Sequence, residues 1–243
     1  MTWVRRFHPA SDPRARLVCF PHAGGSASSF FPVSRAMAPS VEVICLQYPG
    51  RQDRRTEPCL DDVGAFADAA TSALASWTDL PLVLFGHSLR ATIAFETARR
   101  LQASGKEVGA LFASGRRGPT TERDERVHQL PDDGLLAELR RMSGTAGAVL
   151  GDDELVRMIM PALRADYRAA ETYRHSPGET LRCPITVLVG DTDPKVTADE
   201  ARDWADHTTG PFAMTTFPGG HFFLQDHQQE ILTAISKQID ALR

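Results

Sequence analysis

The chain has 243 residues, of which 42% are hydrophobic, so it is long enough to bury a full core within one α/β domain. Its 27 Lys and Arg against 31 Asp and Glu give a formal charge of −4, and the absence of an overall basic field argues against a nucleic-acid partner. The N-terminal residues contain no apolar segment of signal-peptide length, and no later stretch is long enough to span a bilayer. We therefore expect a cytoplasmic protein that does not associate with membranes.

Strand-like and helix-like segments alternate along the chain. Short apolar runs predict strands, and apolar residues at helical spacing predict helices between them. Strands that alternate with helices of this length imply right-handed crossovers and a mostly parallel sheet. The expected strands are residues 3–7 (a short edge strand), 16–20, 41–46, 82–86, 110–115, 184–190 and 212–217. The expected helices include 61–77, one from 89 to a stop at 104–105, and a C-terminal helix from about 225.

The four cysteines carry no predicted chemistry. They are Cys19, Cys45, Cys59 and Cys183, and none has CxxC spacing. Three of them, all but Cys59, lie in or beside apolar strand-like runs, which favours buried free thiols over disulfides or zinc ligands.

A loop of glycine and small residues, 21–29, follows the strand that ends at Phe20. Such a loop lets backbone N–H groups face a ligand at close range. A phosphate cradle is one alternative, but neither GxGxxG nor a GK[ST] ending is present. We interpret the loop as half of an oxyanion hole, with the Ala23 N–H as donor and His22 as a brace; without a nucleophile downstream it would be a plain loop.

That nucleophile is predicted at Ser88. An apolar strand ends at Gly86, a serine follows two residues later, and a helical pattern starts at Leu89. This is the sequence of a nucleophile elbow, a sharp strand-to-helix turn that exposes the serine hydroxyl; a purely structural serine is the alternative. The N–H of Leu89, the residue after the nucleophile, completes the oxyanion hole with Ala23.

Arg90 departs from the elbow motif G-x-S-x-G, which has glycine at this position. A cation in the first turn of a helix opposes the helix dipole by about 0.3–1 kcal/mol. Arg90 must therefore direct its stem outward or find a carboxylate. We predict that Arg90→Gly leaves activity intact or raises it; a loss above about a hundredfold would reveal a positive role.

The base and its orienting acid are predicted after the last two strands. Asp191 and Asp193 follow the strand 184–190, and we prefer Asp193 as the orienting acid, because Asp191 is suited to shaping the turn. His221 follows the final strand in a glycine-flanked loop and completes the chain order Ser, Asp, His. His207 and His227 lie in helical or turn stretches and are expected to be solvated. The predicted catalytic residues are thus Ser88, Asp193 and His221.

A helical insertion separates the strands that end near Gly115 and begin near Cys183. Apolar residues at helical spacing predict helices over 131–142 and 152–173, with a flexible break at 143–147. We expect residues of about 117–181 to form a lid inserted in a single domain of residues 1–243. The alternative is that these helices merely pack onto the body.

Four motifs, in order, make the chain resemble the type II thioesterases that accompany polyketide synthases and non-ribosomal peptide synthetases. They are residues 20–27 (FPHAGGSA), 47–51 (QYPGR), 86–89 (GHSL) and 217–224 (FPGGHFFL). The resemblance implies an α/β-hydrolase fold and a serine thioesterase that clears aberrant acyl groups from the phosphopantetheine arm of acyl or peptidyl carrier domains in antibiotic biosynthesis. It also implies Ser88, Asp193 and His221 as the triad, and it departs at Arg90, where the family usually has glycine.

An acidic carrier protein is the partner that the resemblance implies. Candidate docking charges, with an ordinary solvated face as the alternative, are Arg51, Arg54, Arg55, Arg116 and Arg117. We expect a monomer with no metal and no cofactor of its own, since the substrate is carried on the partner. Two other functions stay open: a small-molecule carboxylesterase or lipase with the same triad, and a weakened hydrolase that serves as a synthase-binding module.

Overall fold

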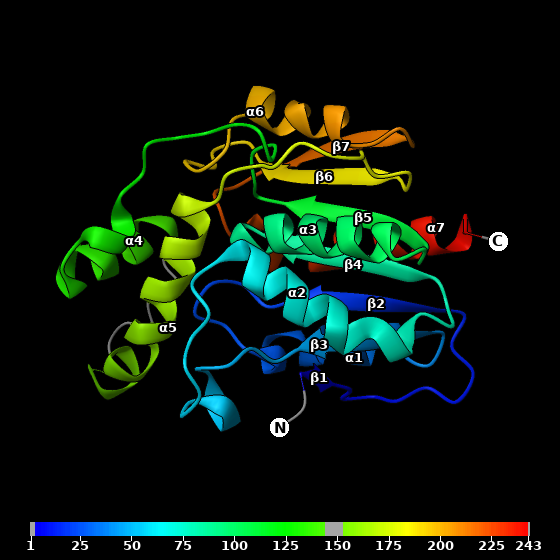
Figure 1. Ribbon diagram of the computed structural model, residues 1–243, viewed down its shortest axis with the longest axis horizontal. Helices are drawn as coiled ribbons and strands as arrows, with labels where there is room; N and C mark the ends of the chain where they lie inside the picture. The colour runs from blue at the N-terminus through cyan, green and yellow to red at the C-terminus, as the bar shows by residue number, and fades with distance from the viewer. Residues whose placement is uncertain (1–2, 144–152, 243) are drawn as a thin grey trace.

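A seven-stranded sheet forms the centre of the protein (Figure 1). The computed structural model describes residues 3–143 and 153–242. The strand order is β1-β3-β2-β4-β5-β6-β7, and only β1 runs antiparallel to its neighbour among these described strands. The strands are β1 (Val4–Arg5), β2 (Ala15–Phe20), β3 (Val41–Leu46), β4 (Leu82–His87), β5 (Val108–Ser114), β6 (Ile185–Gly190) and β7 (Phe212–Phe217).

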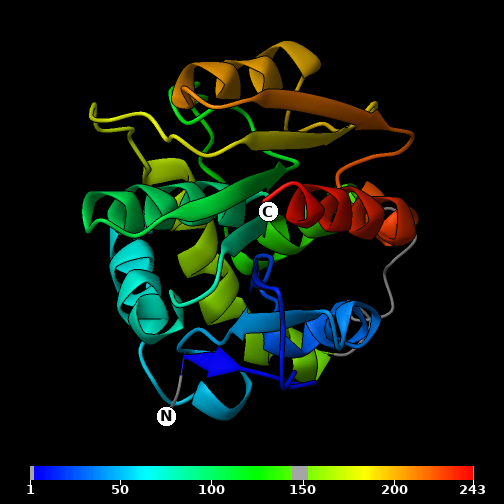
Figure 2. The same ribbon diagram turned by 90° about the vertical axis from the view of Figure 1, so that its right-hand side faces the viewer.

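Helices cover both faces of this sheet, as Figure 2 shows from its end. Alternate residues of each central strand point to opposite faces, so Leu84 joins the apolar cluster of α2 and α3, whereas Phe85 joins that of α1 and α7. The α-helices are α1 (Phe31–Met37), α2 (Val63–Leu74), α3 (Leu89–Ala103), α4 (Asp132–Ser143), α5 (Asp153–Thr172), α6 (Ala198–Arg202) and α7 (Gln228–Asp240). Short 3₁₀ helices span residues 27–30, 52–54, 75–77, 127–129, 203–207 and 223–225.

The α/β architecture with a mostly parallel sheet is confirmed, and most element positions agree with the sequence patterns. Asp62 explains where α2 begins, because its side chain accepts a hydrogen bond from the Ala65 N–H and caps the helix. The C-terminal helix begins at Gln228 rather than near 225, since residues 223–225 form a 3₁₀ turn. Helices α1 and α6 were not predicted from the sequence patterns. No helix in the described ranges combines the length and apolar character needed to cross a membrane.

The insertion between β5 and β6 lies beyond the carboxyl ends of the strands (Figure 1). Its helices α4 and α5 agree with the predicted ones and share a separate apolar cluster, which consists of Leu135, Val156, Met160, Leu163 and Tyr167. The predicted break at 143–147 falls, after Ser143, outside the described residues. The lid boundaries and its function as a lid stay predictions.

The expectation that His207 is solvated is wrong. His207 is 6% exposed, and its ring packs against Phe95 and His175 at centroid distances of 5.4 and 5.0 Å. Burial lowers the pKa of His207 to about 4. The sequence placed His207 in a helical or turn stretch, and it lies in the 3₁₀ turn at 203–207, but local sequence did not indicate that this turn faces the core. The four cysteines are free, and the three in strand-like runs are buried as expected.

Candidate active site

The turn after β4 has the strained backbone of a nucleophile elbow. Ser88 has φ +57° and ψ −131°, a backbone conformation that residues other than glycine rarely adopt. A Cβ at Gly86 would collide with the Arg90 carbonyl, so only glycine lets the strand pass this close to α3. The Ser88 N–H donates to the Ser114 carbonyl at 2.7 Å and fixes the turn against β5. Strain held in this way positions a side chain for chemistry.

The structure brings His221 and Asp193 into contact. Nδ1 of His221 lies 2.9 and 3.0 Å from the two carboxylate oxygens of Asp193, and both side chains are almost fully buried. Asp191 has a different role: its carboxylate accepts the Gly219 N–H at 2.8 Å, so it shapes the loop before His221 rather than its own turn. The geometry therefore favours Asp193 over Asp191 as the partner of the imidazole.

Ser88 and His221 line one cavity of about 50 Å³, which we call the catalytic cavity. No hydrogen bond joins their side chains among the described residues. Ala23 and Leu89 also line this cavity, and within the described ranges neither N–H donates to another group. The two predicted oxyanion donors are thus free to bind a developing negative charge beside the serine. The catalytic roles of these residues stay predictions.

Two aromatic residues that the sequence analysis left without a role surround His221. The His87 ring lies 4.8 Å from the His221 ring, and its Nδ1 is 2.9 Å from the Ser114 hydroxyl. Burial, followed by the neighbouring His221, holds the pKa of His87 well below its ordinary value, so His87 is neutral. Phe222 packs edge-on against His221 at 5.2 Å. Their positions beside Ser88 and His221 in the sequence were the available signal.

Arg90 finds a carboxylate, the second of the two alternatives. Its side chain is 0% exposed, and Nη2 donates to Asp166 Oδ1 of α5 at 2.6 Å. The guanidinium also stacks on the Tyr48 and Phe66 rings, 4.3 and 4.5 Å from their centroids. Because Arg90 is buried, ion-paired and stacked on two aromatic rings, the structure gives no support to the expectation that Arg90→Gly leaves activity unchanged.

Most of the arginines expected at a docking surface are internal. Arg51 and Arg117 are each 4% exposed and Arg54 is 5% exposed, and all three donate to carboxylates of this chain. Arg116 is partly buried and donates to the Thr92 hydroxyl and the Ala170 carbonyl. Only Arg55 of the five is exposed. Burial thus contradicts a docking role for Arg51, Arg54 and Arg117, because their charges are already neutralised inside the protein.

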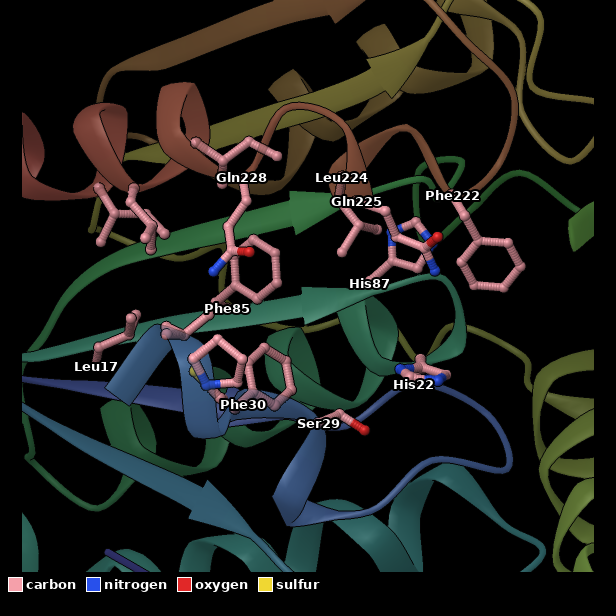
Figure 3. A pocket seen from close by; sticks show the side chains of 16 residues that line it. Leu17, His22, Ser29, Phe30, Phe85, His87, Phe222, Leu224, Gln225 and Gln228 are labelled. Atoms are coloured by element: carbon pink, nitrogen blue, oxygen red, sulfur yellow. The ribbon is translucent and has the colours of Figure 1, made fainter. Parts of the chain in front are cut away.

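A second, larger cavity adjoins the catalytic one. Figure 3 shows the side chains that line it. This apolar cavity has a volume of about 270 Å³ and lies between the sheet and helices α1 and α7. His22, His87 and Phe222 line both cavities, so the two spaces are neighbours across these three rings. Most of its lining residues are apolar, among them Leu17, Phe30, Phe85, Ile231, Leu232 and Ile235.

Comparison with known proteins identifies similar chains over nearly the whole length. Residues 15–239 match the thioesterase domain family. A probable cadicidin biosynthesis thioesterase of Streptomyces griseus is 55% identical, over 98% of this chain and 66% of its own length. Thioesterase PikA5 of Streptomyces venezuelae is 52% identical, over 98% and 85%. The solved type II thioesterase BorB from the borrelidin biosynthetic cluster superposes with a TM-score of 0.93 at 50% identity, over 98% and 97%.

Proposed function

The chain belongs to the thioesterase family, has an α/β-hydrolase fold and is a thioester hydrolase. We propose that it removes stalled or aberrant acyl groups from the phosphopantetheine arm of carrier domains. One arrangement carries the proposal: Ser88 on a strained elbow, the buried His221–Asp193 pair, and two free N–H groups around one cavity. This is the set of groups that acyl transfer through a serine requires.

The first half of the reaction forms an acyl-serine. Ser88 Oγ attacks the thioester carbonyl carbon while His221 takes the hydroxyl proton, and the N–H groups of Ala23 and Leu89 bind the oxyanion. The C–S bond then breaks, and His221 returns the proton to the departing thiolate. Asp193 holds Nδ1 of the imidazole and stabilises its charged form throughout. The hydrogen bond between Ser88 and His221 forms when substrate fills the cavity. In many hydrolases this bond is long in the unliganded enzyme and shortens in the substrate complex.

Water completes the cycle. His221 takes a proton from a water molecule, the resulting hydroxide attacks the acyl-serine, and the acid leaves as the proton returns to Ser88 Oγ. Because the thioester arrives on the partner's phosphopantetheine arm, this scheme needs no cofactor held by the enzyme itself.

The apolar cavity supplies a site for the acyl chain. It adjoins the catalytic cavity across His22, His87 and Phe222, and its walls expose carbon rather than charge. An acyl chain that entered it would exchange water for apolar contacts, which stabilises binding by about 0.8 kcal/mol per methylene. We place the chain there, with the thioester carbonyl at Ser88 and the arm leaving toward solvent.

The names of the relatives support a synthase partner. PikA5 and the cadicidin relative are named as thioesterases, the latter of a biosynthesis pathway, and BorB comes from a biosynthetic cluster. We extend this to an acyl or peptidyl carrier domain as the substrate-bearing partner, a cytoplasmic location and a monomeric enzyme.

Mass spectrometry of loaded carrier proteins tests the proposal. Carrier domains that bear acetyl, propionyl, malonyl or longer acyl groups are incubated with the enzyme, and loss of the acyl mass is followed over time. Ser88→Ala is the control, and labelling of the wild type by a fluorophosphonate reports the nucleophile. Turnover of free esters far above that of carrier thioesters would contradict the proposal and favour a carboxylesterase.

A further inference from the structure

Asp166 of α5 is a fully buried carboxylate that joins three distant segments. Its Oδ2 accepts the Gly24 N–H at 2.9 Å, and its Oδ1 accepts Nη2 of Arg90 at 2.6 Å and Nη2 of Arg51. The Asp166 and Arg90 side chains are 0% exposed, and that of Arg51 is 3% exposed. Burial alone would raise the pKa of Asp166, but the attraction of Arg51 and Arg90 outweighs it and holds the pKa below its ordinary value. Asp166 therefore carries a charge inside the protein.

Arg90 also contacts the start of the loop 21–29, which carries Ala23. Its Nε donates to the Pro21 carbonyl at 2.8 Å, while its Nη2 reaches Asp166. The loop is consequently held at Pro21 by Arg90 and at Gly24 by Asp166. Ala23, the proposed oxyanion donor, lies between these two points. A planar guanidinium with several N–H donors can make both contacts at once, which a lysine ammonium cannot reproduce.

The same contacts tie the loop to the insertion. Asp166 lies 76 residues from Arg90 and 142 from Gly24, and it is carried by α5 rather than by the sheet. Displacement of α5 from the core would separate the Asp166 carboxylate from Gly24 and from both arginines, and would leave buried charges without compensation, which is strongly unfavourable.

We propose that Asp166 and Arg90 are positioning residues that hold the Ala23 N–H in place for the oxyanion and couple it to the position of α5. This rests on the proposed roles of Ser88 and Ala23. Arg90, which replaces the glycine of the elbow motif, thus acts together with the Asp166 carboxylate of α5 to set the geometry of the loop around Ala23. A loop shifted by about 1 Å loses on the order of a hundredfold in rate.

The test compares Asp166→Asn, Arg90→Gly and Arg90→Lys on a short acyl thioester of N-acetylcysteamine. We expect kcat to fall about a hundredfold in the first two variants while KM changes less than about threefold, with partial recovery in Arg90→Lys. An alkyl boronic acid, which forms a tetrahedral adduct with serine, should lose affinity in proportion to kcat, whereas a non-hydrolysable amide analogue should bind as before. A purely structural role would not separate these two ligands.

Arg168→Gln is the matched control, because Arg168 lies on the same helix and makes an exposed ion pair with Asp61 at 2.9 Å. It should leave kcat and boronate affinity unchanged. Variants at 166 and 90 that keep kcat and boronate affinity within threefold of wild type would overturn the proposal, as would a loss of kcat without loss of boronate affinity.

Amide exchange in the wild-type enzyme keeps the proposal falsifiable if the variants fail to fold. The Gly24 N–H, held by Asp166, should exchange at least about a hundredfold more slowly than an unstructured amide; an unprotected Gly24 would overturn the proposal. Because the substrate is a small thioester, inactivity toward carrier domains would refute the proposed function and leave this test unaffected.

Discussion

The length of the acyl chain that the enzyme accepts should follow the depth of the apolar cavity. A dry cavity of about 150 Å³ holds the six carbons of benzene, so a volume of about 270 Å³ has room for a chain of roughly ten carbons. Each buried methylene contributes about 0.8 kcal/mol, which corresponds to about a fourfold rise in kcat/KM per methylene until the cavity is filled.

Substitution of Ile235 should change the depth of the apolar cavity. It lines the cavity from α7, is 2% exposed and lies outside the proposed catalytic groups. Tryptophan at this position adds bulk equal to about two methylenes, so Ile235→Trp should lower kcat/KM for a decanoyl thioester by about fifteenfold, or ~1.6 kcal/mol, and leave acetyl unchanged. Ile235→Ala should have the opposite effect and move the optimum to longer chains.

A series of acyl thioesters from two to fourteen carbons measures the effect, with circular dichroism to establish that each variant is folded. The opposite directions of the two substitutions at one position separate cavity depth from general damage, because a damaged protein would lose activity on every chain. If acetyl and decanoyl turnover fell in parallel, or if neither variant moved the optimum, the acyl chain does not enter this cavity.

Three further predictions concern the catalytic groups, the elbow and the pH dependence of stability. Ser88→Ala and His221→Ala should each lower kcat by about 10⁴–10⁶ in steady-state kinetics with an unchanged circular dichroism spectrum; activity within tenfold of wild type would remove them from the mechanism. Gly86→Ala should cost about 3 kcal/mol or more in urea unfolding because its Cβ would meet the Arg90 backbone, whereas Gly220→Ala, with open space around its Cβ, should cost less than about 1 kcal/mol. Burial lowers the pKa of His207 to about 4, so the unfolded chain binds a proton at this histidine more tightly than the folded protein does. The contribution of neutral His207 to the unfolding free energy is therefore complete above pH 6.5 and is lost as the pH falls toward 4. His207→Gln should therefore reduce the drop in unfolding free energy between pH 7 and pH 5 by about 1–2 kcal/mol, and an unchanged drop would show that another group causes it.

Local patterns were enough to predict the framework of the site. Apolar runs and turn residues predicted every strand of the sheet, since strand formation and turn chemistry depend on neighbouring residues. Because parallel strands end at one edge, the order of the loops after β4, β6 and β7 already placed Ser88, Asp193 and His221 together. The choice of Asp193 over Asp191 rested on the suitability of Asp191 for a turn, and the contact between Asp193 and His221 agrees with that choice.

Only the tertiary structure decided which charged and aromatic side chains lie inside. Arg90 and Asp166 meet across 76 residues, and nothing in the sequence around either one indicates the other. The burial of His207, the pairing of Arg51 with Asp166, and an apolar cavity between α1 and α7 have the same origin. Secondary structure responds to neighbours along the chain, whereas the burial and the charge partner of a side chain depend on segments that folding brings together from far away.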